Sequence, residues 1–76
     1  MNKKRRERIS RAVQMLEDAK SILETAQDEE QDCYDNIPEP LQCTERYEAM
    51  EDAISNLETA VSCLDEAISS AESALA

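Results

Sequence analysis

Cysteine and carboxylate side chains are the chain's candidates for chemistry, and the cysteines offer little of it. Cys33, Cys43 and Cys63 show no Cys-x-x-Cys spacing, and there is no histidine to complete a zinc site. No base or cation is placed to activate a thiolate. We read all three as reduced thiols, with Cys63 on the outer face of its helix the most open to reagents. The alternative is a disulfide between Cys33 and Cys43, which the sequence allows in an oxidising setting.

The carboxylates are numerous but lack the setting that catalysis or metal binding requires. A di-iron site between helices needs histidine or a glutamate-rich interior, and the sequence has neither. A catalytic carboxylate needs a pocket that shifts its acidity, which a slender helical rod does not provide. The sequence therefore predicts a non-enzyme with no metal and no cofactor.

Charge is divided unevenly along the chain. Residues 1–11 carry six basic side chains and one acidic one, a net charge of +5, whereas residues 12–76 carry two basic and seventeen acidic ones, a net charge of −15. A basic tip thus precedes an acidic rod. The rod would repel nucleic acid and anionic lipid, while the tip would attract them.

Length and composition favour a small helical protein that self-associates. The 76 residues include no Gly, Trp, Phe or His and only two Pro. Ala, Glu, Leu and Ser dominate, as in long helices. A chain this short has a marginal core without a staple, a metal or a partner subunit. No apolar run is long enough for a signal-peptide core or a membrane span, so we expect a soluble, cytoplasmic protein.

Heptad repeats predict two helices. In the second, one row is Tyr47, Ile54, Val61, Ile68 and Leu75, and the next is Met50, Leu57, Leu64 and Ala71. In the first, one row is Ile9, Leu16 and Leu23, and the second is Ala12, Ala19, Ala26 and Cys33. The fold class is therefore all-α, an antiparallel two-helix hairpin of coiled-coil type with an alanine-rich seam.

The bend follows from prolines and capping residues. Pro38 and Pro40 end the first helix near Asn36, a reasonable left-handed terminal residue. Thr44 can cap the second helix. We predict one domain, 1–76, with helix 1 at about 3–34, the bend at 35–43 and helix 2 at about 44–75. Ile37 and Leu41 are expected to close the end of the hairpin over Tyr34 and Tyr47.

Side-chain volumes suggest a register in which paired residue numbers add to about 80. Small residues then face β-branched ones, and leucine faces leucine. In this register Arg6 lies near Glu72 and Lys20 lies near Glu58. Such exposed ion pairs choose orientation more than they supply stability.

Apolar residues left outside this seam predict an oligomer interface on one flank of the hairpin. Two hairpins joined there would form a four-helix bundle, as a homodimer or a larger assembly. The alternative is a monomeric hairpin with an alanine-rich flank. The predicted interface residues are Met15, Ile22, Ala53, Ala60, Ala67 and Ala74.

Two charged clusters are candidate contact surfaces. The basic one would contact phosphate or an acidic protein, unless it only neutralises the C-terminal end of helix 2. It consists of Lys3, Lys4, Arg5, Arg6, Arg8 and Arg11. The acidic one is a possible partner-binding patch, in which Glu30 occupies a heptad core position. It consists of Asp28, Glu29, Glu30 and Asp32.

Residues 35–42 (DNIPEPLQ) and 45–51 (ERYEAME) resemble a segment of small helical proteins encoded by phages and mobile elements of Gram-positive bacteria. The resemblance implies an accessory protein of the bacterial cytoplasm that binds a host protein. Our leading hypothesis is a hairpin homodimer acting by protein–protein interaction, as an inhibitor of a host defence or nucleic-acid enzyme. The alternatives are a nucleic-acid or nucleotide binder that uses the basic tips of an oligomer, and a structural coiled-coil subunit.

Overall fold

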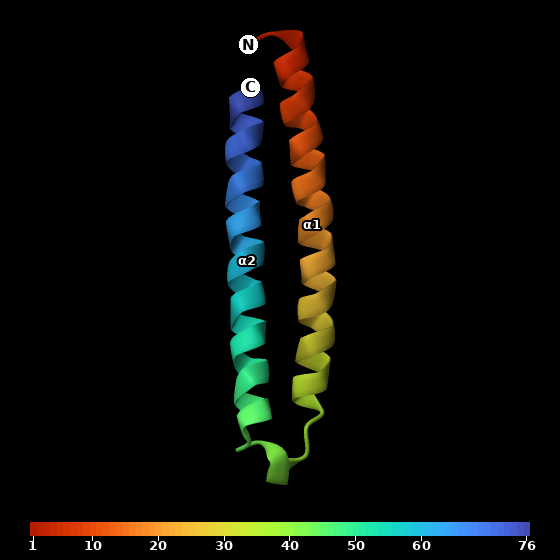
Figure 1. Cartoon of the computed structure of the whole chain (residues 1–76), viewed down its shortest axis with the longest axis vertical. Coiled ribbons are helices and arrows are strands. Elements are labelled where there is room, and N and C mark those ends of the chain that lie inside the picture. The colour runs from red at the N-terminus through yellow and green to blue at the C-terminus, as the bar shows by residue number, and fades with distance from the viewer.

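Two long antiparallel helices make up nearly the whole molecule. The computed structural model describes all 76 residues, with α1 at Lys3–Asp35, a short 3₁₀ turn η1 at Glu39–Leu41, and α2 at Glu45–Leu75. The helices run side by side from the bend, so both termini lie at the same end of a rod of 60 × 14 × 14 Å (Figure 1). The all-α hairpin is therefore confirmed.

Capping side chains set the ends of α1. The Asn2 side chain accepts a hydrogen bond from the Arg5 backbone N–H at 2.8 Å, which satisfies one of the free amides of the first turn. At the other end Asn36 donates from its backbone to Cys33 and from its side chain to the Asp32 carbonyl. The expected left-handed conformation of Asn36 is wrong, since its φ is −99° and its ψ is 6°. Its hydrogen bonds satisfy the last carbonyls without that conformation.

The bend is tied to α2 through Thr44. The Thr44 hydroxyl accepts from the Tyr47 N–H at 3.3 Å and donates to the Leu41 carbonyl at 2.9 Å. The predicted threonine cap is confirmed, and α2 begins at the following residue. Pro38 and Pro40 lie just before and within η1, where the missing N–H of proline is tolerated.

The seam side of α2 is the one that the heptads predict. Every member of the two predicted rows is half-buried, as are two of the flanking alanines, Ala53 and Ala60. Ala67 and Ala74 remain exposed. Since none of these side chains is fully buried, α1 covers only part of the apolar stripe of α2.

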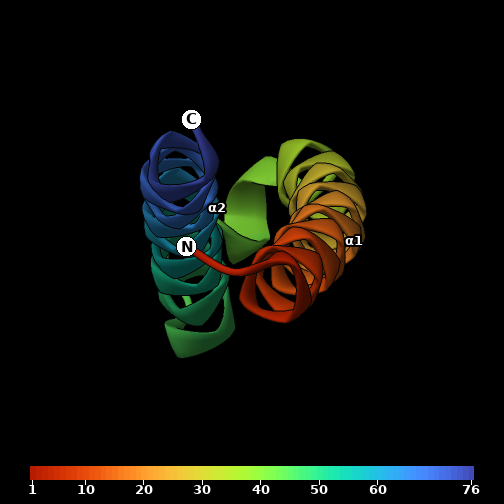
Figure 2. The same ribbon diagram turned by 90° about the horizontal axis from the view of Figure 1, so that it is seen from above.

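The seam side of α1 differs from the prediction. The half-buried or buried residues beside the Ile9, Leu16 and Leu23 row are Val13, Lys20, Gln27 and Tyr34. The expected alanine row lies at the edge or outside, because Ala19 and Ala26 are half-buried while Ala12 and Cys33 are exposed. The helix is thus turned toward a row that contains two polar residues. Figure 2, seen along the rod, shows α1 and α2 side by side with no further element on either side of the pair.

The ion pair of Lys20 corrects the predicted register. Lys20 Nζ lies 2.5 Å from Asp65, whereas Glu58 was the expected partner. Tyr34 hydrogen-bonds Glu51. Fourteen residues separate Lys20 from Tyr34 and also Asp65 from Glu51, so both contacts follow one antiparallel register. Glu58 and Asp65 belong to the same row of α2, and the altered rotation of α1 brings Asp65 within reach of Lys20.

Val13 provides a test of the seam, because it is the one buried residue and is 8% exposed. We expect Val13→Ala to lower the free energy of unfolding by about 1–2 kcal/mol through lost burial and a small void. The neighbouring substitution Ala12→Ser, at an exposed position of the predicted seam row, should change it by less than about 0.5 kcal/mol. Urea titrations followed by circular dichroism would measure both. Equal losses would contradict the observed rotation of α1.

Candidate interaction surfaces

One flank of the hairpin is polar and is held by side-chain contacts between the helices. It joins the Val13, Lys20, Gln27 and Tyr34 row of α1 to an acidic row of α2. Lys20 pairs with Asp65, and the Tyr34 hydroxyl donates to Glu51. The acidic row consists of Glu51, Glu58, Asp65 and Glu72. This flank therefore fixes how the helices lie against each other.

Both contacts shift the acidity of a side chain. The hydrogen bond to Glu51 is the largest cause that raises the pKa of Tyr34, and a hydrogen bond with Tyr47 adds to it. The hydrogen bond to Asp65 raises the pKa of Lys20 above 10.5. In each case the folded chain favours the protonated form, because the carboxylate attracts the shared proton.

The opposite flank is apolar and is not covered by any part of the chain. Met15 and Ile22 of α1 are 63% and 69% exposed. The alanines of the α2 row 53, 60, 67 and 74 lie beside the seam. Cys33, in the Ala12 row of α1, and Arg46, in the α2 alanine row, line the same hollow, which places both rows on this flank. The structure thus brings the six predicted interface residues to one flank, which we call the apolar flank.

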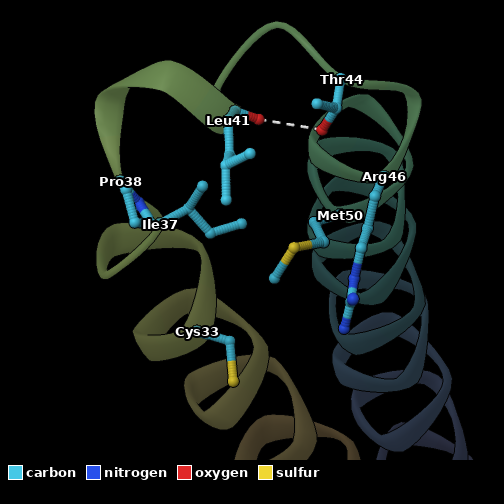
Figure 3. A pocket seen from close by; sticks show the side chains of 7 residues that line it. All are labelled: Cys33, Ile37, Pro38, Leu41, Thr44, Arg46 and Met50. Atoms are coloured by element: carbon cyan, nitrogen blue, oxygen red, sulfur yellow. Dashed lines mark hydrogen bonds between the residues drawn. The ribbon is translucent and has the colours of Figure 1, made fainter.

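A shallow hollow of about 410 Å³ lies where the apolar flank meets the bend. Ile37, Leu41 and Met50 point toward one another there, and Arg46 extends along α2 (Figure 3). Leu41 is 52% exposed, so it does not close the hairpin end as expected. That end is instead filled by the stacked rings of Tyr34 and Tyr47, whose centroids are 4.5 Å apart. The complete lining is Cys33, Ile37, Pro38, Leu41, Thr44, Arg46 and Met50.

The basic tip has two different roles for its side chains. The Arg6 guanidinium donates to the Leu75 carbonyl at the C-terminal end of α2, where it offsets the negative end of the helix. This replaces the expected contact with Glu72. Lys4, Arg8 and Arg11 are exposed, take part in no ion pair, and surround a shallow open depression with Glu7. The tip therefore keeps cations that a partner can reach.

The acidic patch lies at the other end of α1, next to the bend. Asp28, Glu29 and Asp32 are exposed, and Glu30 is half-buried at the edge of the seam. None of them pairs with a cation of the chain, since the Lys20–Asp65 contact is the one ion pair. The two ends of α1 thus carry opposite, unneutralised charge, and Arg8 and Glu29 are about six helical turns apart.

The three cysteines have the same surroundings in one respect, since each lies at the surface. All three thiols are free and exposed, including Cys33, which was expected to be a small seam residue.

Sequence reasoning missed Arg46 as a lining residue of the bend hollow. The signal was available, because Arg46 is the one basic residue after Lys20 and occupies the heptad row of the α2 alanines.

No protein-family model, curated protein or solved structure matches this chain. The resemblance of the bend to phage and mobile-element proteins stays a prediction. Neither helix has a stretch both long enough and apolar enough to cross a bilayer. The structure defines the class, an antiparallel α-helical hairpin with one polar and one apolar flank.

The polar flank predicts a loss of stability at alkaline pH. An unfolded tyrosine has a pKa of about 10. The raised pKa of Tyr34 therefore stabilises the fold below about pH 10, and this contribution is lost as the pH rises further. We expect the melting temperature of the wild type to fall more steeply above about pH 10 than that of Tyr34→Phe. Thermal melts across this range would measure it, and parallel curves would contradict a stabilising Tyr34–Glu51 bond.

Proposed function

We propose that this chain is a non-enzymatic protein that acts by protein–protein interaction, as a homodimer of hairpins joined through the apolar flank. The observation that carries the proposal is the exposed apolar surface of the hairpin. One residue in the chain is buried, while Met15 and Ile22 project from a helix face that no part of the chain covers. Exposed apolar surface of this kind marks interaction sites on small proteins.

Surface area supports the same conclusion. A compact monomer of this 8.6 kDa mass exposes roughly 4,700 Å². This chain exposes 5786 Å², because two helices side by side cannot enclose a core. The excess of about 1,100 Å² is larger than the roughly 800 Å² that each partner contributes to a standard interface. A second hairpin on the apolar flank would remove much of this excess and make a four-helix bundle.

The surface of such a bundle favours a protein partner over a polyanion. Most of its charge is acidic, at −15 for residues 12–76 of each chain. An acidic exterior attracts basic protein surfaces and repels nucleic acid and anionic lipid. A host defence or nucleic-acid enzyme fits this description, although that target rests on the resemblance of the bend alone.

Charge placed in the apolar flank tests the homodimer. In sedimentation equilibrium we expect the wild type to have twice the mass of the chain. The double variant Ala60→Glu with Ala67→Glu should have the mass of one chain, because the added carboxylates would lose their hydration at the interface. The matched control, Ser62→Glu with Ser69→Glu, adds the same charge on an outer exposed row. A wild-type monomer, or equal dissociation of both variants, would contradict the proposal.

A second candidate function is supported by the basic tip. Lys4, Arg8 and Arg11 are exposed and unpaired, so they could bind the phosphates of a nucleic acid. If so, the chain should retard a labelled duplex at low salt, and Arg8→Glu with Arg11→Glu should abolish the retardation. Binding should also weaken steeply as salt rises. No retardation at low salt would remove this candidate, and Ser62→Glu with Ser69→Glu, on an exposed row away from the tip, serves as the control.

A further inference from the structure

We infer that the occupant of the apolar flank is a second copy laid bend-to-tip, so that the basic tip of each hairpin meets the acidic patch of the other. This inference rests on the proposed homodimer and adds its orientation. A two-fold axis perpendicular to the rod relates the copies, α1 packs against α1 and α2 packs against α2, and every neighbouring pair of helices is antiparallel.

The outermost row of the apolar flank on α1 has a basic residue at one end, an acidic residue at the other end and two apolar residues between them. It consists of Arg8, Met15, Ile22 and Glu29, seven residues apart, and all four are exposed. A reversed copy brings Arg8 within about one helical turn of Glu29 of the second copy, and Met15 within about one turn of Ile22. Two ion pairs, one at each end, would then enclose an apolar centre.

The neighbouring row supports an axis near the same point. Ala12, Ala19 and Ala26 are spaced evenly about Ala19, which would lie close to the two-fold axis. Small side chains there let the helices approach while Met15 and Ile22 fill the remaining space.

The level of this axis on α2 follows from the ion pair between the helices. Lys20, the residue after Ala19, contacts Asp65. On α2 this level is residue 66, next to Ala67, and Ala60 and Ala74 are evenly spaced about Ala67 and would face each other across the axis. One axis therefore serves both helices, and it passes through the alanines predicted to form the interface.

Charge selects this orientation over the one with both bends at the same end. In that arrangement α1 would pack on α2 of the second copy, and the acidic patch would lie level with residues 53–57 of α2. Glu51, Asp52 and Glu58 border that segment, and no cation lies within it. The bend-to-tip orientation instead sets the tip, with its net charge of +5, over a segment whose five acids are Asp28, Glu29, Glu30, Asp32 and Asp35. Unlike charges across an interface fix its register, and like charges exclude the alternative.

The same orientation gives the bend hollow an occupant. Arg5 and Cys33 belong to one heptad row, and they are as evenly placed about Ala19 as Ala12 and Ala26 are. The first turn of α1 in one copy would therefore lie over the Cys33 side of the hollow in the other. The exposed Leu41 and the half-buried Met50 would then border the dimer interface.

Crosslinking of single-cysteine variants tests the orientation. The three exposed cysteines are first replaced by alanine. One variant of this chain then carries Ala12→Cys, and the other carries Ala26→Cys. The two are mixed, unfolded and refolded together, and treated with a short bismaleimide reagent. We expect mixed dimers that contain one chain of each kind, whereas either variant alone should give few. Circular dichroism before crosslinking confirms that each variant is helical.

A second pair, Ile22→Cys and Ala60→Cys, reports the alternative. It would crosslink between chains if α1 packed on α2 of the second copy, and that result without crosslinking of the first pair would overturn the inference. If sedimentation shows a dimer and neither pair crosslinks, the orientation is also wrong while the homodimer stands. If the chain is a monomer, the proposed homodimer fails as well.

Reversing the charges gives an independent measure of the same contact. We expect Arg8→Glu and Glu29→Arg each to raise the dissociation constant of the dimer by about tenfold, because each puts two like-charged pairs into the interface. The double variant should return to near the wild-type value. Tighter association of Glu29→Arg alone would overturn the inference, since it would place Glu29 against acids of α2.

Discussion

The structure depends on a single seam between two helices. Each helix has one neighbour, so a side chain on the seam can be covered from one side only, and most seam residues remain half-buried. Val13 alone is enclosed enough to count as buried. This limit follows from the arrangement and applies to any two-helix hairpin, because an enclosed core needs neighbours in at least two directions. The apolar rows beside the seam therefore stay in contact with water.

The two flanks of the seam have different tasks. On the polar flank, Lys20–Asp65 and Tyr34–Glu51 set the rotation and the register of the helices. These contacts are exposed, so they choose one arrangement among several more than they add stability. Because the polar contacts are gathered on one flank, the other is free of charge along its central part. That separation allows the apolar flank to bind a second hairpin without burying an unpaired charge.

The ends of the rod are marked by charge. Arg6 neutralises the C-terminal end of α2, while the remaining tip cations and the acidic patch have no partner within the chain. A monomer would keep these opposite charges far apart at the two ends of α1. A bend-to-tip dimer would bring them together twice and leave an exterior that is mainly acidic. This exterior, and not a pocket, is the surface that the proposed function offers to a protein partner.

The sequence by itself determined two helices, a proline-containing bend and the apolar side of α2. Heptad rows, Pro38, Pro40 and the Thr44 cap act locally, so they can be read without knowing what lies opposite. Only the tertiary structure decided which side of α1 faces α2. The Ala12 and Val13 rows have the same seven-residue period and lie about 100° apart on the helix, so periodicity cannot choose between them. The choice depends on contacts across the seam, where Lys20 and Tyr34 reach carboxylates of α2 that an alanine row would leave unpaired.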